Sequence, residues 1–393
     1  DARIEVAFDQ GLLRAERRDA SSDADDTAKL AGAPTLPIQE LELELKSGPS
    51  RALITAATQW ADRHALWIDT ISKAARGERL AQGRVGAVAT PGRIAAFGGG
   101  KPPDGRTLLR RWTAVCLEQV LGNASQLSAG EGPPDAEVVH QLRVGLRRLR
   151  SVWRELGRCA DEPIDWQPAV RESFDALGRV RDRDAAVARF ADAITAAGGR
   201  TLDPSGHGPD PDLRALIRAR PFQHAMLSLL AFALDADGNA DDGKAGGGKT
   251  GGGKTDRPQD DRDGIDLVVQ RLRKLHRGLR QAARRFDTLT DDDRHRVRKR
   301  AKRLRYLIEL ARPLLPTGDA DAYLKRLRRT QQRLGDYQDL CTAIDAYRDA
   351  VHAGQHDAWF GVGWLEAGRA RHLARCRKAL RRLARTRPPL SAH

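Results

Sequence analysis

The sequence is poor in the residues that mark several common protein classes. Aromatic side chains make up 5% of its 393 residues, cysteine occurs four times and methionine once. So few aromatic rings disfavour binding of nucleic acid by base stacking. The cysteines form no Cys-x-x-Cys pair, which disfavours a zinc site and is typical of a reducing compartment; they are Cys116, Cys159, Cys341 and Cys376.

Long apolar segments are also missing. The longest run, Ala225 to Leu234, is too short to cross a bilayer, so we expect no membrane span. No secretory signal is visible, and we expect a cytoplasmic protein. The chain begins at Asp1 and its single methionine is Met226, so we interpret it as part of a longer protein.

Positive charge is what the sequence has in excess. The formal net charge is +15 and the sequence pI is about 10.2. Such an excess favours a polyanionic partner, which could be nucleic acid, an anionic membrane surface or a phosphate polymer.

One basic segment, Asp293 to Tyr306, has the period of a helix. At 100° per residue, four cationic or imidazole side chains fall within an arc of about 80° and form a stripe roughly 15 Å long. These are His295, Arg298, Lys302 and Arg305. Apolar residues occupy the opposite face: Val297, Ala301, Leu304, Ile308 and Ala311. We predict an amphipathic helix with one packing face and one cationic face.

The same pattern occurs earlier in the chain, at a constant offset of 155 residues: His140, Arg143, Arg147 and Arg150. A Leu-Gly pair followed by an aspartate comes after each copy, at Gly178 and Asp182 and again at Gly335 and Asp339. We interpret the two occurrences as an internal duplication. The glycines predict tight helix corners, and the aspartates are expected to cap a helix or to bind an arginine.

The chain divides into four parts by composition. We predict an α+β domain over 1–86, a linker over 87–105, a helical domain over 106–388 with halves at about 106–234 and 265–388, and a Gly-rich linker over 235–264. Helices are expected at 106–123, 135–157, 166–178, 181–197, 212–235, 264–286, 291–312, 319–334, 338–352 and 357–385. Gly243 to Thr250 matches the P-loop pattern, and so does Gly248 to Thr255. A P-loop needs a buried strand before it and a helix after it, but here acidic polar residues precede and Asp-Arg-Pro-Gln-Asp-Asp follows, so a flexible loop is favoured.

The duplicated helix is the candidate site. Two rows of cations repel one another, and a bound anion would relieve that repulsion. If the halves pack about a pseudo-two-fold axis, the two stripes line a groove for a linear polyanion. Further contacts are predicted from Arg148, Lys299, Arg277, Arg280, Lys325, Arg328, Arg375 and Lys378. The arginine fork suits phosphate oxygens, and we expect the two histidines to gain a proton on binding.

The N-terminal part has a different character. Ile4 to Phe8 predicts a strand, Gln10-Gly11 a turn, and Leu12 to Ala15 a return strand. Ile38 to Lys46 alternates with period two and places Glu40, Glu42 and Glu44 on one strand face. The three carboxylates indicate either a half-exposed edge strand or a site for a divalent cation.

Two stretches of this part, IQELELELKSGP and IDTISKAARGERL, resemble the later portion of a CYTH domain, of the triphosphate tunnel metalloenzyme family. The resemblance implies a β-barrel that binds triphosphate with Mg²⁺ or Mn²⁺. It assigns Glu40, Glu42 and Glu44 to the metal, and Lys73, Arg76 and Arg79 to the tunnel. The family's opening Glu-x-Glu-x-Lys strand is absent, so we expect a half barrel and little triphosphatase activity.

The duplicated His-x-x-Arg helices and Leu-Gly…Asp pairs resemble the conserved histidine α-helical domain, CHAD, over about residues 105 to 388. The resemblance implies two helical bundles related by a pseudo-two-fold axis around a basic cavity that binds inorganic polyphosphate. It therefore implies a non-catalytic, cofactor-free module that targets polyphosphate granules. The alternatives are a metal-dependent triphosphatase that acts on tripolyphosphate in the longer parent protein, and a general nucleic-acid binder, although no specific nucleic acid is expected.

Overall fold

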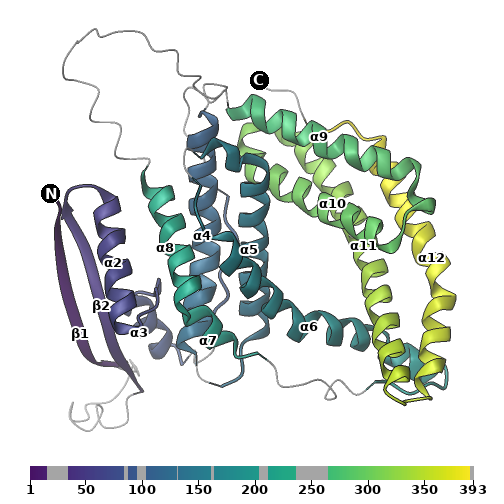
Figure 1. Cartoon of the computed structure of the whole chain (residues 1–393), viewed down its shortest axis with the longest axis horizontal. Coiled ribbons are helices and arrows are strands. Elements are labelled where there is room, and N and C mark those ends of the chain that lie inside the picture. Colours follow the sequence, from purple (N-terminus) through teal and green to yellow (C-terminus); the bar gives the residue numbers. More distant parts are fainter. Residues whose placement is uncertain are drawn as a thin grey trace, which may run out of the picture.

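The computed structural model describes residues 1–15, 34–83, 87–94, 103–130, 132–160, 163–202, 211–235 and 264–389, without the side chains at 179–182 and 317. Within these ranges the chain is mainly helical, and a two-stranded sheet lies at one end (Figure 1). The P-loop-like pattern and the side chain of Asp182 lie outside the described residues. None of the described helices is both long and apolar enough to cross a membrane.

The sheet is an antiparallel ribbon of β1 (Arg3–Arg14) and β2 (Thr35–Ser47). The predicted turn at Gln10-Gly11 is wrong, because β1 continues through it and Gly11 pairs with Ile38. A long partner strand supplies backbone hydrogen bonds along β1, and this outweighs the local turn preference of the Gln-Gly pair. The expected β2 strand is confirmed, but the described residues contain this ribbon and no barrel.

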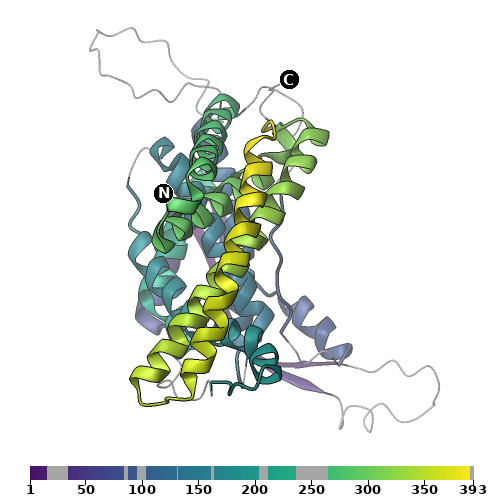
Figure 2. The same cartoon turned by 90° about the vertical axis from the view of Figure 1, so that its right-hand side faces the viewer.

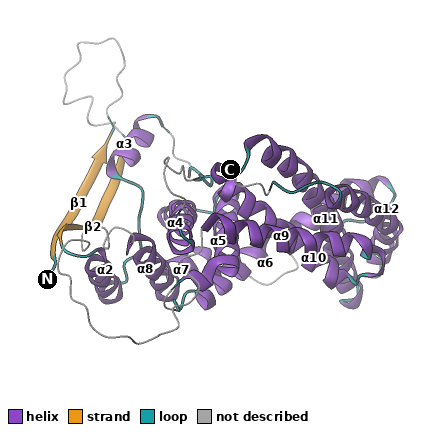
Figure 3. Ribbon diagram, turned by 90° about the horizontal axis from the view of Figure 1, so that it is seen from above, coloured by secondary structure: helices purple, strands orange, loops and turns teal. Residues whose placement is uncertain are grey.

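The ribbon is joined to the helical part through α2 (Ser50–His64), which packs against α8, and α3 (Lys73–Ala81), which contacts β1. Figure 3 shows the strands at one end of the molecule and the helices beyond them. The outer part of β1 stays open on its apolar face, where Val6, Phe8 and Leu12 are 45%, 61% and 57% exposed.

Two extended segments lie along α4 (Gly105–Ala129), although 87–105 was predicted as a linker. The backbone N–H of Thr70 donates to Ser125 Oγ at 2.9 Å. Thr90 and Asn123 exchange two hydrogen bonds, at 3.0 and 2.8 Å. Buried amide and hydroxyl groups of α4 therefore satisfy the backbone of 68–70 and 87–94, and this attaches the N-terminal part to the bundle.

The helical part consists of two consecutive halves that share one apolar core. The first half contains α4, α5 (Ala136–Leu156), α6 (Gln167–Ala196), α7 (Leu213–Arg218) and α8 (Arg220–Leu234), with a short 3₁₀ turn at Gly157–Cys159. The second contains α9 (Gly264–Arg284), α10 (Asp291–Ala311), α11 (Thr317–His352) and α12 (Ala358–Ala384), with 3₁₀ turns at Phe286–Thr288 and Arg312–Leu314. Seen from the side of α12, α11 and α12 form a long antiparallel pair (Figure 2).

The predicted helix corners at Gly178 and Gly335 are wrong. Each glycine lies inside one continuous helix, α6 or α11, so four predicted helices are two long ones. A Cβ added at Gly335 would lie 2.9 Å from a guanidinium nitrogen of Arg298, so the end of that side chain would have to shift. The segment 212–235, predicted as one helix, is instead broken at Ala219, whose backbone is extended. Pro221 in the first turn of α8 has no N–H with which to continue the preceding helix.

The two halves meet through a buried ion pair. Nη1 of Arg303 on α10 is 2.8 Å from Oε1 of Glu155 on α5, and the Glu155 side chain is 9% exposed. Burial lowers the pKa of Arg303, and the carboxylate of Glu155 opposes this effect only in part. The pair therefore fixes the two cationic helices relative to each other.

We expect Glu155→Gln to lower the free energy of unfolding by about 3 kcal/mol, because the change leaves the charge of Arg303 buried without its counter-charge. Urea unfolding followed by far-UV circular dichroism measures the effect. Asp357→Asn, which removes the exposed pair with Arg200, is the control and should leave the midpoint unchanged. Equal midpoints for Glu155→Gln and wild type would show that the pair does not stabilise the junction.

Candidate anion-binding site

The first cationic stripe lies on α5. Asp135 caps this helix by accepting the backbone N–H of Val138 at 2.9 Å. The predicted packing face is confirmed, since Leu142, Leu146 and Leu149 have no exposed surface. The cationic face of α5 is thereby directed away from the core and towards α6.

Three arginines of this stripe gather around one aromatic ring. The guanidinium carbons of Arg143, Arg147 and Arg150 lie 5.6, 5.1 and 5.2 Å from the centre of the Phe174 ring on α6. The ring face attracts cations and keeps the three groups close together. Burial lowers the pKa of Arg150, and repulsion from Arg147 acts in the same direction. His140 lies exposed at the N-terminal end of the stripe.

Arg148, predicted as a further phosphate contact beside the stripe, is turned away from it. Its side chain is buried, and it donates to Gln119 Oε1 at 2.8 Å and to the carbonyl oxygen of Arg93 at 3.0 Å. Arg148 therefore attaches the extended segment 87–94 to the bundle. One residue after Arg147 corresponds to about 100° around the helix, which turns Arg148 towards the packing side.

The second stripe, on α10, lies along α11. Nδ1 of His295 is 2.7 Å from Oε1 of Gln338. Arg298 lies against Gly335, and a Cβ at this position would come within 2.9 Å of its guanidinium. The apolar face is buried as predicted, including Val297 and Leu304.

The C-terminal end of the second stripe is partly neutralised. Nε of Arg305 is 3.7 Å from Oε1 of Glu309, and Arg328 of α11 donates to the same carboxylate at 3.2 Å. Lys302 is half-buried and Lys299 is exposed. The second stripe is therefore most densely cationic between His295 and Lys302.

The pKa of His295 is below its ordinary value. Burial is the main cause, and repulsion from Lys299 and Arg298 adds to it, while the hydrogen bond with Gln338 opposes it. In the free protein the imidazole is therefore neutral at pH 7, and a bound anion would favour its protonated form.

The other predicted contacts are dispersed over the second half. Arg277 and Arg280 are exposed on α9, and Lys325 is exposed on α11. Arg375 and Lys378 of α12 border a cavity described below. The helices α5, α6, α10 and α11 surround the centre of the molecule in Figure 1, and a common groove between the two stripes stays a prediction.

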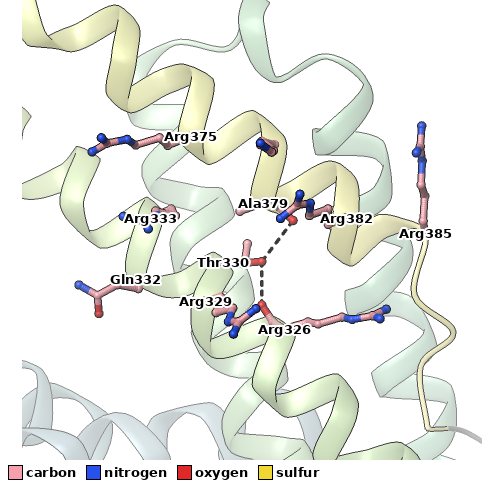
Figure 4. Close-up of a pocket in the computed structure, with 10 residues that line it drawn as sticks. Arg326, Arg329, Thr330, Gln332, Arg333, Arg375, Ala379, Arg382 and Arg385 are labelled. Atoms are coloured by element: carbon pink, nitrogen blue, oxygen red, sulfur yellow. Dashed lines mark hydrogen bonds between the residues drawn. The ribbon is translucent and has the colours of Figure 1, made fainter.

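A cavity of about 930 Å³ lies between α11 and α12. Ten residues line it, as Figure 4 shows: Arg326, Arg329, Thr330, Gln332, Arg333, Arg375, Lys378, Ala379, Arg382 and Arg385. Five of its seven cations were missed from the sequence: Arg326, Arg329, Arg333, Arg382 and Arg385. Their spacing of three and four residues could have indicated a stripe on each helix.

The carboxylates of the ribbon are paired with a lysine and an arginine. Oxygens of Asp9, Glu40 and Glu42 lie within 4.8 Å of one another. The ammonium of Lys73 binds all three carboxylates, and Arg76 also binds Glu40. Burial would raise the pKa of Glu40, but the hydrogen bonds from Arg76 and Lys73 outweigh it and hold that pKa below its usual value.

These residues do not fit a divalent cation in the arrangement that the structure shows. The ammonium of Lys73 lies among the three oxygens, where a metal ion would have to bind. Glu44, also predicted as a metal ligand, instead pairs with Lys46 at 2.8 Å. The group of close carboxylates contains Asp9 in its place, which the strand pairing of Asp9 with Glu40 brings there.

The fold and the two stripes together define a helical protein with a duplicated cationic helix. The model of the CHAD domain matches residues 113–348, more than half of the chain, and the chain belongs to the CHAD domain family. It is also similar to a solved structure, the crystal structure of the CHAD domain from the plant Ricinus communis. That match has 24% identity and a TM-score of 0.56, and it covers 77% of this chain and 99% of that one.

We expect the affinity for long-chain polyphosphate to rise as pH falls from 8 to 6. The pKa of His295 is lowered in the free protein and raised by bound phosphate, so binding takes up a proton between these two pKa values. Uptake of one proton can raise the affinity by at most about tenfold for each unit by which the pH falls. Titrations of wild type and His295→Gln measure the difference.

The exposed His356 supplies the control, and His356→Gln should keep the wild-type pH profile. If His295→Gln and wild type have the same profile, proton uptake by His295 plays no part in binding.

Proposed function

We propose that the chain binds inorganic polyphosphate through the two His-headed stripes of α5 and α10. The observation that carries this proposal is the pair of matching cationic helices, each laid along the next long helix, α6 or α11. Membership of the CHAD family supports it, because that family is associated with polyphosphate binding. We further propose that this binding attaches the protein to polyphosphate granules.

The chemistry of the stripes suits a phosphate chain better than nucleic acid. Arginine binds phosphate oxygens through two parallel hydrogen bonds and keeps its charge at every physiological pH. Phe174, the aromatic ring at the first stripe, is already engaged by three guanidinium groups. It is therefore not available as a platform on which a base could stack.

The double variant Arg147→Glu with Lys302→Glu should weaken polyphosphate binding by about a hundredfold, because each change removes a phosphate contact and adds a repulsion. Both side chains lie on the cationic faces and not in the core, so the helical fold should persist. Titration at fixed salt measures the affinity, and far-UV circular dichroism checks the helix content.

A matched control is Arg14→Glu with Arg63→Glu, which changes the net charge equally at exposed positions outside the helical halves. It should bind within about threefold of wild type, since only distant charge is altered. Near-native affinity of the stripe variant would refute the assignment. Preference for single-stranded RNA over polyphosphate in competition would favour the nucleic-acid alternative.

The triphosphatase alternative has its own test. We expect no phosphate release when the chain is incubated with tripolyphosphate and Mn²⁺, because Lys73 occupies the only group of three close carboxylates found among the described residues. Colorimetric phosphate detection measures it. Metal-dependent release that disappears in Glu40→Gln would instead establish a hydrolase.

A further inference from the structure

The cavity between α11 and α12 lies apart from both predicted stripes. On α11, the residues that face α10 include Gln331 and Gly335. Arg326, Arg329 and Arg333 line the cavity, and at 100° per residue they lie on roughly the opposite side of the helix. The cavity therefore lies on the side of α11 that faces away from α10, and it does not continue the α10 stripe.

The cations of this cavity are largely without counter-charges. Arg333 binds Asp336, with 3.3 Å between Nη1 and the carboxylate, and Arg326 donates to the hydroxyl of Thr386 at 2.7 Å. The other five make no ion pair with any described residue: Arg329, Arg375, Lys378, Arg382 and Arg385. Arg303 has the carboxylate of Glu155 as its partner, whereas these five cations lie around one cavity without a carboxylate, and a bound anion would relieve their mutual repulsion.

The cations form two rows along antiparallel helices. Arg375, Lys378, Arg382 and Arg385 follow one another at three and four residues, so the row on α12 is about 15 Å long. Arg326, Arg329 and Arg333 form a shorter row on α11.

The surface between the two rows consists of small residues, and its hydroxyl group already has hydrogen-bond acceptors. Thr330 and Ala379 lie there, and the Thr330 hydroxyl donates to the carbonyl oxygens of Arg326 and Ala379, at 3.0 and 3.4 Å (Figure 4). The cations, and not the floor, are therefore the groups that can bind a ligand.

Two rows of cations over a small floor suit a linear ligand that carries a charge every few ångströms. The lining contains no aromatic side chain, so it offers no platform for a nucleic-acid base. It also contains no carboxylate that could hold a metal ion. The ligand that fits this lining is a phosphate chain without bases, bound by charge and by the paired N–H groups of arginine.

We propose that the α11–α12 cavity is a second phosphate-chain site, independent of the two stripes. This inference rests on the proposed polyphosphate function, but it assigns the ligand to residues that neither stripe contains. A short ligand such as tripolyphosphate then occupies both sites separately.

Calorimetric titration with tripolyphosphate at fixed salt tests the proposal. We expect two binding events for wild type, and one for Arg329→Glu with Arg382→Glu. Lys378→Ala with Arg382→Ala removes charge without reversing it, and is measured as the variant that disturbs packing least. It should weaken one binding event. For that event, the slope of log affinity against log salt concentration should become shallower by about 0.7 for each phosphate contact that is lost.

The other variants separate this proposal from the stripe assignment. Arg147→Glu with Lys302→Glu should lose the stripe event and retain the cavity event, and Arg14→Glu with Arg63→Glu should retain both. Two unchanged events in the cavity variants would overturn the second site. So would loss of all binding in the stripe variant, or displacement of tripolyphosphate from the cavity by oligouridylate at lower concentration. An unchanged stripe event in the stripe variant would instead refute the function proposed above.

Discussion

Repulsion among crowded cations is the constraint on which this structure depends. Two amphipathic helices place their positive residues on one face, and the fold must then hold those faces beside other helices. It does so with a buried apolar face on each helix, with the ring of Phe174 under three arginines, and with the Arg303–Glu155 pair between the halves. None of these contacts removes the excess charge, which remains available for a ligand.

The distribution of partners separates structural cations from binding cations. Lys73 and Arg76 are engaged by carboxylates of the ribbon, and Arg148 is engaged by an amide and a carbonyl group. The row on α12, by contrast, has no acidic partner among the described residues. A buried cation that gives up hydration must gain equivalent hydrogen bonds, whereas an exposed cation can keep water until an anion replaces it.

Periodicity predicted the two basic helices correctly, and with them the buried faces around Leu146 and Leu304. The helix breaks were predicted less well. Gly335 suggested a corner, yet it lies within a continuous helix, with the guanidinium of Arg298 against it. Similarly, Gln10-Gly11 suggested a turn, and pairing with β2 kept the strand extended. Local preferences of about 1 kcal/mol were outweighed by contacts with distant segments.

By itself the sequence determined the duplicated stripe, its histidine and its opposite packing face, because a helix converts spacing directly into a face. Only the tertiary structure decided which cations lie together in space. It buried Arg148, replaced Glu44 by Asp9 in the carboxylate group, and brought the rows of α11 and α12 onto one cavity. Those outcomes depend on pairing between segments far apart in the chain, which no local period records.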